Sequence, residues 1–155
     1  MAKLNYLFIY CEWLDSQLVK KWVPDAELVT TGTCADHKVR FVSYRDDNGE
    51  TFEGGCCLSD APGEILHGVV WKVSEEAVLK VDKLTSISTG RYVREYRVVK
   101  GADGKVYSTV SHSIKNPVGD SKPSREYIDH MIAGAKEFKF PEEYIAKLEA
   151  LRCSV

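Results

Sequence analysis

The segment Tyr6–Leu14 constrains the fold more than any other part of the chain, because an apolar run ends there and a helical pattern begins. Apolar residues without interruption, followed by Cys11 and Glu12, are typical of a strand that is buried on both faces. From Leu14 the apolar residues recur at helical spacing as far as Pro24. A loop between a buried strand and a helix N-terminus binds anionic groups in many α/β-type proteins.

Length and composition indicate one soluble domain, which we expect to span residues 1–155. The chain is 44% hydrophobic and 28% charged, with a formal net charge of -2. Lys and Arg are spread among acidic residues, so we expect neither a nucleic-acid partner nor a membrane partner. The sequence shows no membrane-length apolar run and no signal peptide, so we expect a cytoplasmic protein. We expect it to be either a monomer or a weak homodimer.

The five cysteines are odd in number and form no CxxC pair, which argues against a disulfide framework and against a zinc site. Cys56 and Cys57 are neighbours in the sequence, and we interpret them as small buried residues of a strand. We expect no metal ion and no cofactor.

The rest of the chain alternates strand and helix patterns. Asn48-Gly49 is the strongest hairpin-turn signal, and Gly54-Gly55 indicates a bulge within the second strand of that hairpin. Residues 59–64 and 115–123 have loop compositions. Ser74 and Ser124 are expected to cap helices. The expected strands are 6–10, 27–33, 39–44, 51–58, 65–73, 92–100 and 105–114, and a last helix is expected near Pro141. This order predicts an α+β domain with a mixed sheet.

A series of short motifs, in the same order over nearly the whole chain, resembles the γ-glutamylcyclotransferase (AIG2-like) family. The matching elements are Gly54-Gly55, Ala61-Pro62-Gly63-Glu64, Gly68–Val73, Leu79, Asp82, Thr89-Gly90, Tyr92, Val93, Pro123-Ser124, Tyr127, Gly134–Glu137, Pro141, Glu143, Tyr144 and Leu148. The resemblance implies a small mixed β-barrel flanked by helices, with a cavity at one end. It also implies a reaction in which a substrate's α-amine attacks its own γ-amide and forms 5-oxoproline, with a Glu that moves the proton.

Some of the family's functional residues are present in this chain, and others are replaced. Tyr10 corresponds to the tyrosine of the family's substrate loop, and Tyr92 and Tyr127 correspond to two tyrosines of the pocket. Where the family has Gly-Ser-Asn after the loop tyrosine, this chain has Cys11-Glu12-Trp13, and Thr85 falls at the position of the catalytic Glu. The predicted ligand-binding residues are therefore Tyr10, Cys11, Trp13, Leu14, Thr85, Tyr92 and Tyr127.

Several residues allow two interpretations. Glu12 is either a solvated carboxylate near a helix N-terminus or the relocated acid/base of the cavity. Cys11 is interpreted first as a packing residue; the alternative is a nucleophile of lowered pKa, but no His is placed by sequence to activate it. Asp82 is a reserve acid, and its position also suits a helix surface.

Three functions follow from these patterns. The first is a small-molecule enzyme on the cyclotransferase-like fold, with an altered substrate and with Glu12 as acid/base. A Glu in the substrate loop would repel a substrate carboxylate, and the Trp13 side chain would fill or line the pocket. The ligand would therefore be less anionic than a γ-glutamyl substrate, and more apolar or cationic. The second is a binding module that kept the cavity without catalysis. The third is retained cyclisation of γ-glutamyl amines or peptides to 5-oxoproline.

Overall fold

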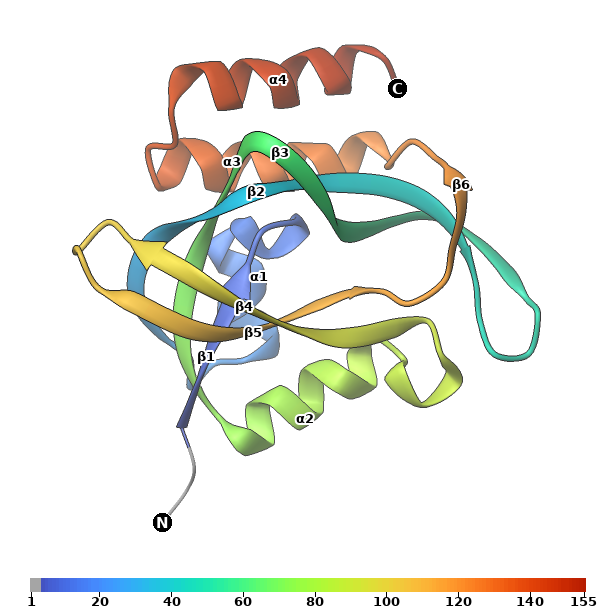
Figure 1. Cartoon of the computed structure of the whole chain (residues 1–155), viewed down its shortest axis with the longest axis horizontal. Helices are drawn as coiled ribbons and strands as arrows, with labels where there is room; N and C mark the ends of the chain where they lie inside the picture. Colours follow the sequence, from blue (N-terminus) through green and yellow to red (C-terminus); the bar gives the residue numbers. More distant parts are fainter. Residues whose placement is uncertain (1–3) are drawn as a thin grey trace.

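The computed structural model describes residues 4–155 and has a mixed α+β architecture (Figure 1). The elements, with η for a 3₁₀ helix, are β1 (Leu4–Ile9), η1 (Glu12–Leu14), α1 (Ser16–Trp22), β2 (Glu27–Arg45), β3 (Thr51–Ser74), α2 (Glu75–Leu84), η2 (Ile87–Thr89), β4 (Tyr92–Gly101), β5 (Val106–Ile114), β6 (Pro117–Asp120), α3 (Arg125–Glu137) and α4 (Glu142–Cys153). Residues 1–3 of the predicted 1–155 domain lie outside the described residues.

The strands form a barrel. They lie in the order β3-β1-β5-β4-β2, and β2 pairs back on β3, while β6 adds to the other side of β2. The pairing of β1 with β5 is parallel, whereas the pairings of β1 with β3 and of β4 with β5 are antiparallel. In Figure 1, α3 and α4 are stacked on one side of the barrel and α2 lies on the opposite side. The prediction of a small mixed barrel flanked by helices is therefore confirmed.

The centre of strand β1 is buried on both faces, as its apolar run predicts, whereas Tyr6 at the start of that run is 37% exposed. Leu7 and Phe8 point to opposite faces of the strand, and each is only 1% exposed. Leu7 packs with α3 residues such as Ile128 and Met131, while Phe8 packs inside the barrel with Leu66. Because side chains on either side of β1 are removed from water, this one strand joins the helix layer to the barrel interior.

Strands β2 and β3 form one long hairpin, which corrects the prediction of a loop over residues 59–64. Ser59 and Asp60 pair with β2, and the pairing then moves directly to Ile65. Residues 61–64 therefore bulge out opposite Asp36, whose carboxylate accepts a hydrogen bond from the Gly63 amide at 2.8 Å. The loop composition was a correct signal for a bulge, but the strand continues through it because its neighbours stay paired.

The second predicted loop, residues 115–123, contains the short strand β6 and was partly wrong. Gly119 of β6 pairs with Ser43 of β2, and the Asp120 carboxylate accepts a hydrogen bond from Arg40 at 2.8 Å. A proline at the start of this strand is compatible with an edge position, where no ladder amide is required of it. The edge strand thus covers part of β2 that would otherwise be open.

The helix caps follow the sequence signals. The Ser74 hydroxyl accepts a hydrogen bond from the Ala77 amide, and the Ser124 hydroxyl accepts one from the Tyr127 amide, both at 3.1 Å. The helix expected from Leu14 is divided, because Asp15 ends η1 and caps α1. Within residues 4–155, no helix is both long and apolar enough to cross a membrane.

Candidate active site

A cavity of about 330 Å³ lies where β1 leaves the barrel. Its size is sufficient for a small metabolite. The loop after β1 forms one wall, and the C-terminal end of α2 with the start of β4 forms another. We call it the central cavity; its lining residues are Phe8, Ile9, Tyr10, Cys11, Glu12, Trp13, Trp22, Cys56, Val81, Leu84, Thr85, Tyr92, His112 and Tyr127.

The loop after β1 is held by its own backbone and by α3. The Leu14 amide donates to the Cys11 carbonyl at 2.9 Å, which closes the 3₁₀ turn. Gly134 of α3 lies against the Leu14 backbone, and a Cβ at residue 134 would come within 2.0 Å of the Leu14 carbonyl oxygen. This close approach requires glycine on α3 and fixes the position of the loop.

Glu12 lies in the cavity wall and is half-buried. Burial raises the pKa of its carboxyl, and the nearby Glu126 and Asp15 raise it further, whereas His130 lowers it. A carboxyl with a raised pKa exchanges its proton closer to neutral pH than an exposed one. Glu12 is therefore a half-buried carboxyl of raised pKa in the cavity wall.

The inner end of the cavity contains phenols and thiols. The Tyr10 hydroxyl donates to the His112 carbonyl at 2.7 Å, and the Tyr127 hydroxyl donates to the Cys56 sulfur at 3.3 Å. Burial raises the pKa of Tyr10, Tyr127 and the Cys11 thiol. The pKa of Cys56 is lowered instead, by hydrogen bonds from Cys11 and Tyr127 that outweigh burial. The tyrosines are therefore neutral hydrogen-bonding groups here, not proton carriers near pH 7.

Thr85 ends α2 and contributes to the cavity wall. Its hydroxyl donates to the Val81 carbonyl at 2.8 Å and lies 3.2 Å from the Asp82 carbonyl. Because a hydroxyl bound to the helix backbone in this way is not a base at neutral pH, Thr85 contributes shape to the cavity, not proton transfer.

The structure brings most of the predicted site residues together. Tyr10, Cys11, Glu12, Trp13, Thr85, Tyr92 and Tyr127 all line the central cavity. Leu14 does not, because it is completely buried beneath α3 in the helix-side core. Asp82 is not a free surface acid, since Arg94 and His112 both bind its carboxylate.

Sequence reasoning missed His112, Cys56 and Trp22 as cavity residues. His112 lies on β5, and its exposure to the cavity follows from strand register, for which the sequence carries no local signal. Trp22 ends α1 and Cys56 belongs to β3, so only the tertiary fold brings them to the loop after β1.

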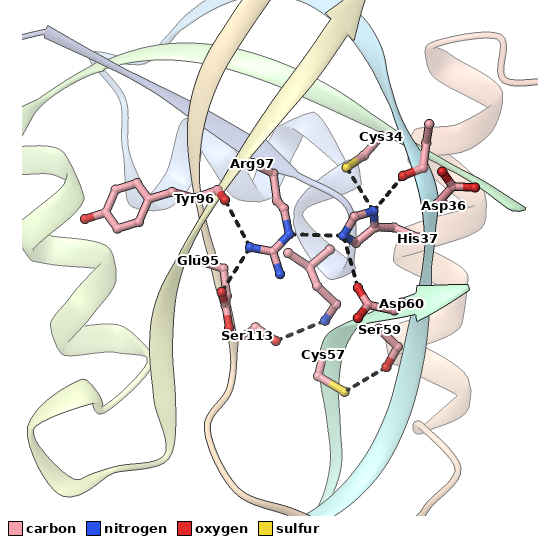
Figure 2. A network of polar contacts seen from close by, with 12 residues as sticks. Cys34, Asp36, His37, Cys57, Ser59, Asp60, Glu95, Tyr96, Arg97 and Ser113 are labelled. Carbon is pink, nitrogen blue, oxygen red and sulfur yellow. Dashed lines mark hydrogen bonds and ion pairs between the residues drawn. The ribbon is translucent and has the colours of Figure 1, made fainter. Parts of the chain in front are cut away.

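A second group of polar residues lies outside the central cavity (Figure 2). We call it the outer network. The His37 ring is 3.4 Å from the Cys34 sulfur, and its Nε2 accepts a hydrogen bond from Arg97 at 3.1 Å. Arg97 also pairs with Glu95 at 3.1 Å, and Asp60 lies 3.7 Å from the His37 ring. None of these residues lines the central cavity.

A family model, curated sequences and solved structures all relate this chain to the same group of proteins. The model of the AIG2-like family matches residues 65–148. Gamma-glutamylcyclotransferase of Bos taurus is 30% identical over 145 residues, which cover 93% of this chain and 77% of that protein. The Homo sapiens protein of the same name is 29% identical over the same shares. A solved structure titled gamma-glutamyl cyclotransferase has a TM-score of 0.85 and 26% identity, covering 96% of this chain and 88% of that one.

Proposed function

The chain belongs to the AIG2-like family of γ-glutamylcyclotransferase relatives, and on that basis we propose that it is a cyclotransferase-like enzyme whose substrate reacts in the central cavity. The observation that carries the proposal is Glu12, a half-buried carboxylate of raised pKa in the wall of a cavity that Tyr92 and Tyr127 also line. In this proposal Glu12 supplies the proton transfer that the family's catalytic Glu supplies from the position of Thr85.

The reaction is an intramolecular acyl transfer. The substrate's amine attacks the carbonyl carbon of its own amide, a five-membered lactam forms, and the amine on the other side of the amide leaves. Glu12 removes a proton from the attacking ammonium, which makes its nitrogen nucleophilic. The cavity walls hold the two groups at reacting distance, and such positioning contributes several kcal/mol to intramolecular reactions, roughly 7–11 in favourable cases.

The proposed substrate differs in charge from a γ-glutamyl compound with a free α-carboxylate. Glu12 is the carboxylate among the described lining residues, and that set includes neither Lys nor Arg. A substrate carboxylate would therefore meet a like charge without a compensating cation, while an ammonium would be attracted. Trp13, Trp22 and Leu84 provide apolar surface beside it. The best substrate is a γ-glutamyl amide whose α-carboxylate is masked as an amide or ester, with an apolar leaving amine.

Mass spectrometry of the lactam product tests this proposal. The protein is incubated with matched pairs of γ-glutamyl amines that have either a free or an amidated α-carboxylate. We expect lactam release from the amidated member at a rate at least tenfold above its free partner. Glu12→Gln should reduce turnover about 100-fold, whereas Glu50→Gln, which changes an exposed carboxylate outside the central cavity, should leave it within twofold.

Two outcomes would redirect the proposal. Faster release of 5-oxoproline from the free-carboxylate substrates would mean that the family's usual reaction is retained. Saturable binding of the amidated compounds without any lactam, and with unchanged affinity in Glu12→Gln, would mean a binding module. The backbone-bound hydroxyl of Thr85 is the observation that favours this second candidate.

A further inference from the structure

His112 is a titratable residue of the central cavity that the proposed reaction has not yet used. It lies on β5 directly opposite Arg94 of β4. Its Nε2 atom is 2.8 Å from the Asp82 carboxylate of α2. Arg94 fixes that carboxylate through hydrogen bonds of 3.0 Å from Nε and 2.6 Å from Nη2. Three elements therefore converge on one imidazole at the cavity wall.

The hydrogen bonds define the protonation state of the ring. Asp82 is ionised, since the bonds from Arg94 and His112 hold its pKa below the usual value although burial opposes them. An ionised carboxylate can only accept, so Nε2 of His112 carries the hydrogen and Nδ1 carries a lone pair. Among residues 4–155, no protein group forms a hydrogen bond with this Nδ1 atom.

Burial keeps the His112 ring neutral. Its side chain is only 7% exposed, and burial lowers its pKa. Asp82 acts in the opposite direction, and Arg94 lowers the pKa again. The Tyr10 hydroxyl binds the His112 carbonyl and not the ring, so it anchors the backbone of β5 to the cavity. The result is an oriented neutral imidazole with one free basic nitrogen.

The chemistry of lactam formation requires two proton transfers from the attacking nitrogen. An ammonium has to lose two protons to become an amide nitrogen that carries one hydrogen, and the leaving amine gains two when it departs as an ammonium. One carboxylate carries one proton at a time. A second acceptor within the same cavity would allow both transfers to be completed without solvent.

We propose that His112, oriented by Asp82, is the second proton-transfer group of the central cavity. This inference rests on the proposed lactam-forming reaction. Glu12 takes the first proton from the ammonium. As the new carbon–nitrogen bond forms, Nδ1 of His112 takes the second. When the old carbon–nitrogen bond breaks, the imidazolium and the protonated Glu12 return these protons to the leaving amine, which restores both groups.

Kinetic profiles of three variants test the role of His112. His112→Gln should lower kcat about 100-fold with KM changed less than threefold, since the residue acts in the transition state. Asp82→Asn keeps the shape of the side chain and loses the charge that orients the ring, so kcat should fall about tenfold. His67→Gln is the matched control, because His67 is also partly buried with a lowered pKa but lies outside the central cavity.

The pH dependence of kcat distinguishes proton transfer by His112 from a purely structural role, because loss of a structural residue would not change the slope of the pH profile. Both proposed bases have to be unprotonated, so activity of the wild type should decline on the acidic side with a slope approaching two. His112→Gln should reduce that slope to one. In Asp82→Asn the imidazolium loses its stabilising carboxylate, so the part of the acidic limb that belongs to His112 should move to lower pH.

The possible failures are distinguishable. If the wild type forms no lactam from any amide, the proposed function fails and this inference fails with it. If the wild type is active and His112→Gln has normal kcat with an unchanged acidic limb, only the role of His112 is overturned. Far-UV circular dichroism of each variant identifies a folding defect, and nitrogen NMR of the wild-type imidazole should show hydrogen on Nε2 at pH 7.

Discussion

The central cavity and the outer network each contain at least one cysteine, a histidine and at least one carboxylate, but they differ in which hydrogen-bonding atoms are left without a partner. In the outer network His37 uses both ring nitrogens, because Nδ1 lies 2.7 Å from the Ala35 carbonyl and Nε2 accepts from Arg97 at 3.1 Å (Figure 2). In the cavity, the Nε2 atom of His112 forms a hydrogen bond with Asp82, and Nδ1 forms none with any residue from 4 to 155. The two regions therefore share residue types, and the difference between them is a ring nitrogen in the cavity that has no hydrogen-bond partner within the described part of the chain.

The cysteines show the same contrast. Cys34 is 3% exposed, its sulfur contacts His37, and it lines no part of the central cavity. The Nδ1 hydrogen of His37 is directed to a carbonyl, so His37 cannot take a proton from Cys34 as a catalytic pair would require. Cys11 is partly exposed and lines the cavity. The outer network thus joins β2 to β4, while the cavity remains open to a ligand.

The largest expected effect comes from Leu14→Ala, which tests whether Leu14 belongs to the core or to the site. Leu14 is 0% exposed and packs beneath α3. Removing its side chain should lower the free energy of unfolding by about 3 kcal/mol, measured by urea denaturation. Leu14→Met is the control and should cost less than about 1.5 kcal/mol. An unchanged stability with a raised KM would instead assign Leu14 to ligand binding, as the sequence alone predicts.

A smaller effect is expected from His37→Gln, which removes the centre of the outer network. The hydrogen bond from Arg97 and the contact with Asp60 would be weakened, while the Arg97–Glu95 pair remains. We expect a loss of about 1 kcal/mol in the free energy of unfolding and no change in lactam release. A marked fall in turnover with intact stability would show that the outer network takes part in the chemistry.

Local signals predicted the elements well where one physical cause dominates. The strand of Leu7 and Phe8 follows from apolar side chains on both faces, and the helix starts follow from Ser74 and Ser124. The hairpin at Asn48-Gly49 also formed, with Gly49 at a φ of 80°. These features depend on residues that are neighbours in the chain.

Signals failed where distant partners decide the outcome. Ser59 and Asp60 have a loop composition, yet backbone pairing with β2 keeps them in a strand. Leu14 is adjacent to the cavity loop in sequence, but the contact with Gly134 directs it into the core. The role of His112 depends on the register of β5 against β4 and on the approach of α2, which composition and spacing do not encode.

The smallest expected effect is a difference in alkylation rate among the cysteines, which is measured on the unmutated protein. Iodoacetamide at pH 8 should label Cys153 first, because it is exposed. Cys11 should react more slowly, since burial raises its pKa and leaves little thiolate, and Cys34, which is 3% exposed, should react more slowly than Cys11. A γ-glutamyl amide bound in the central cavity should slow labelling of Cys11 and leave Cys153 unaffected, as measured by peptide mass spectrometry. Equal protection of Cys34 would show that ligand binding reaches the outer network, and the contrast between an open cavity and a closed network would no longer hold.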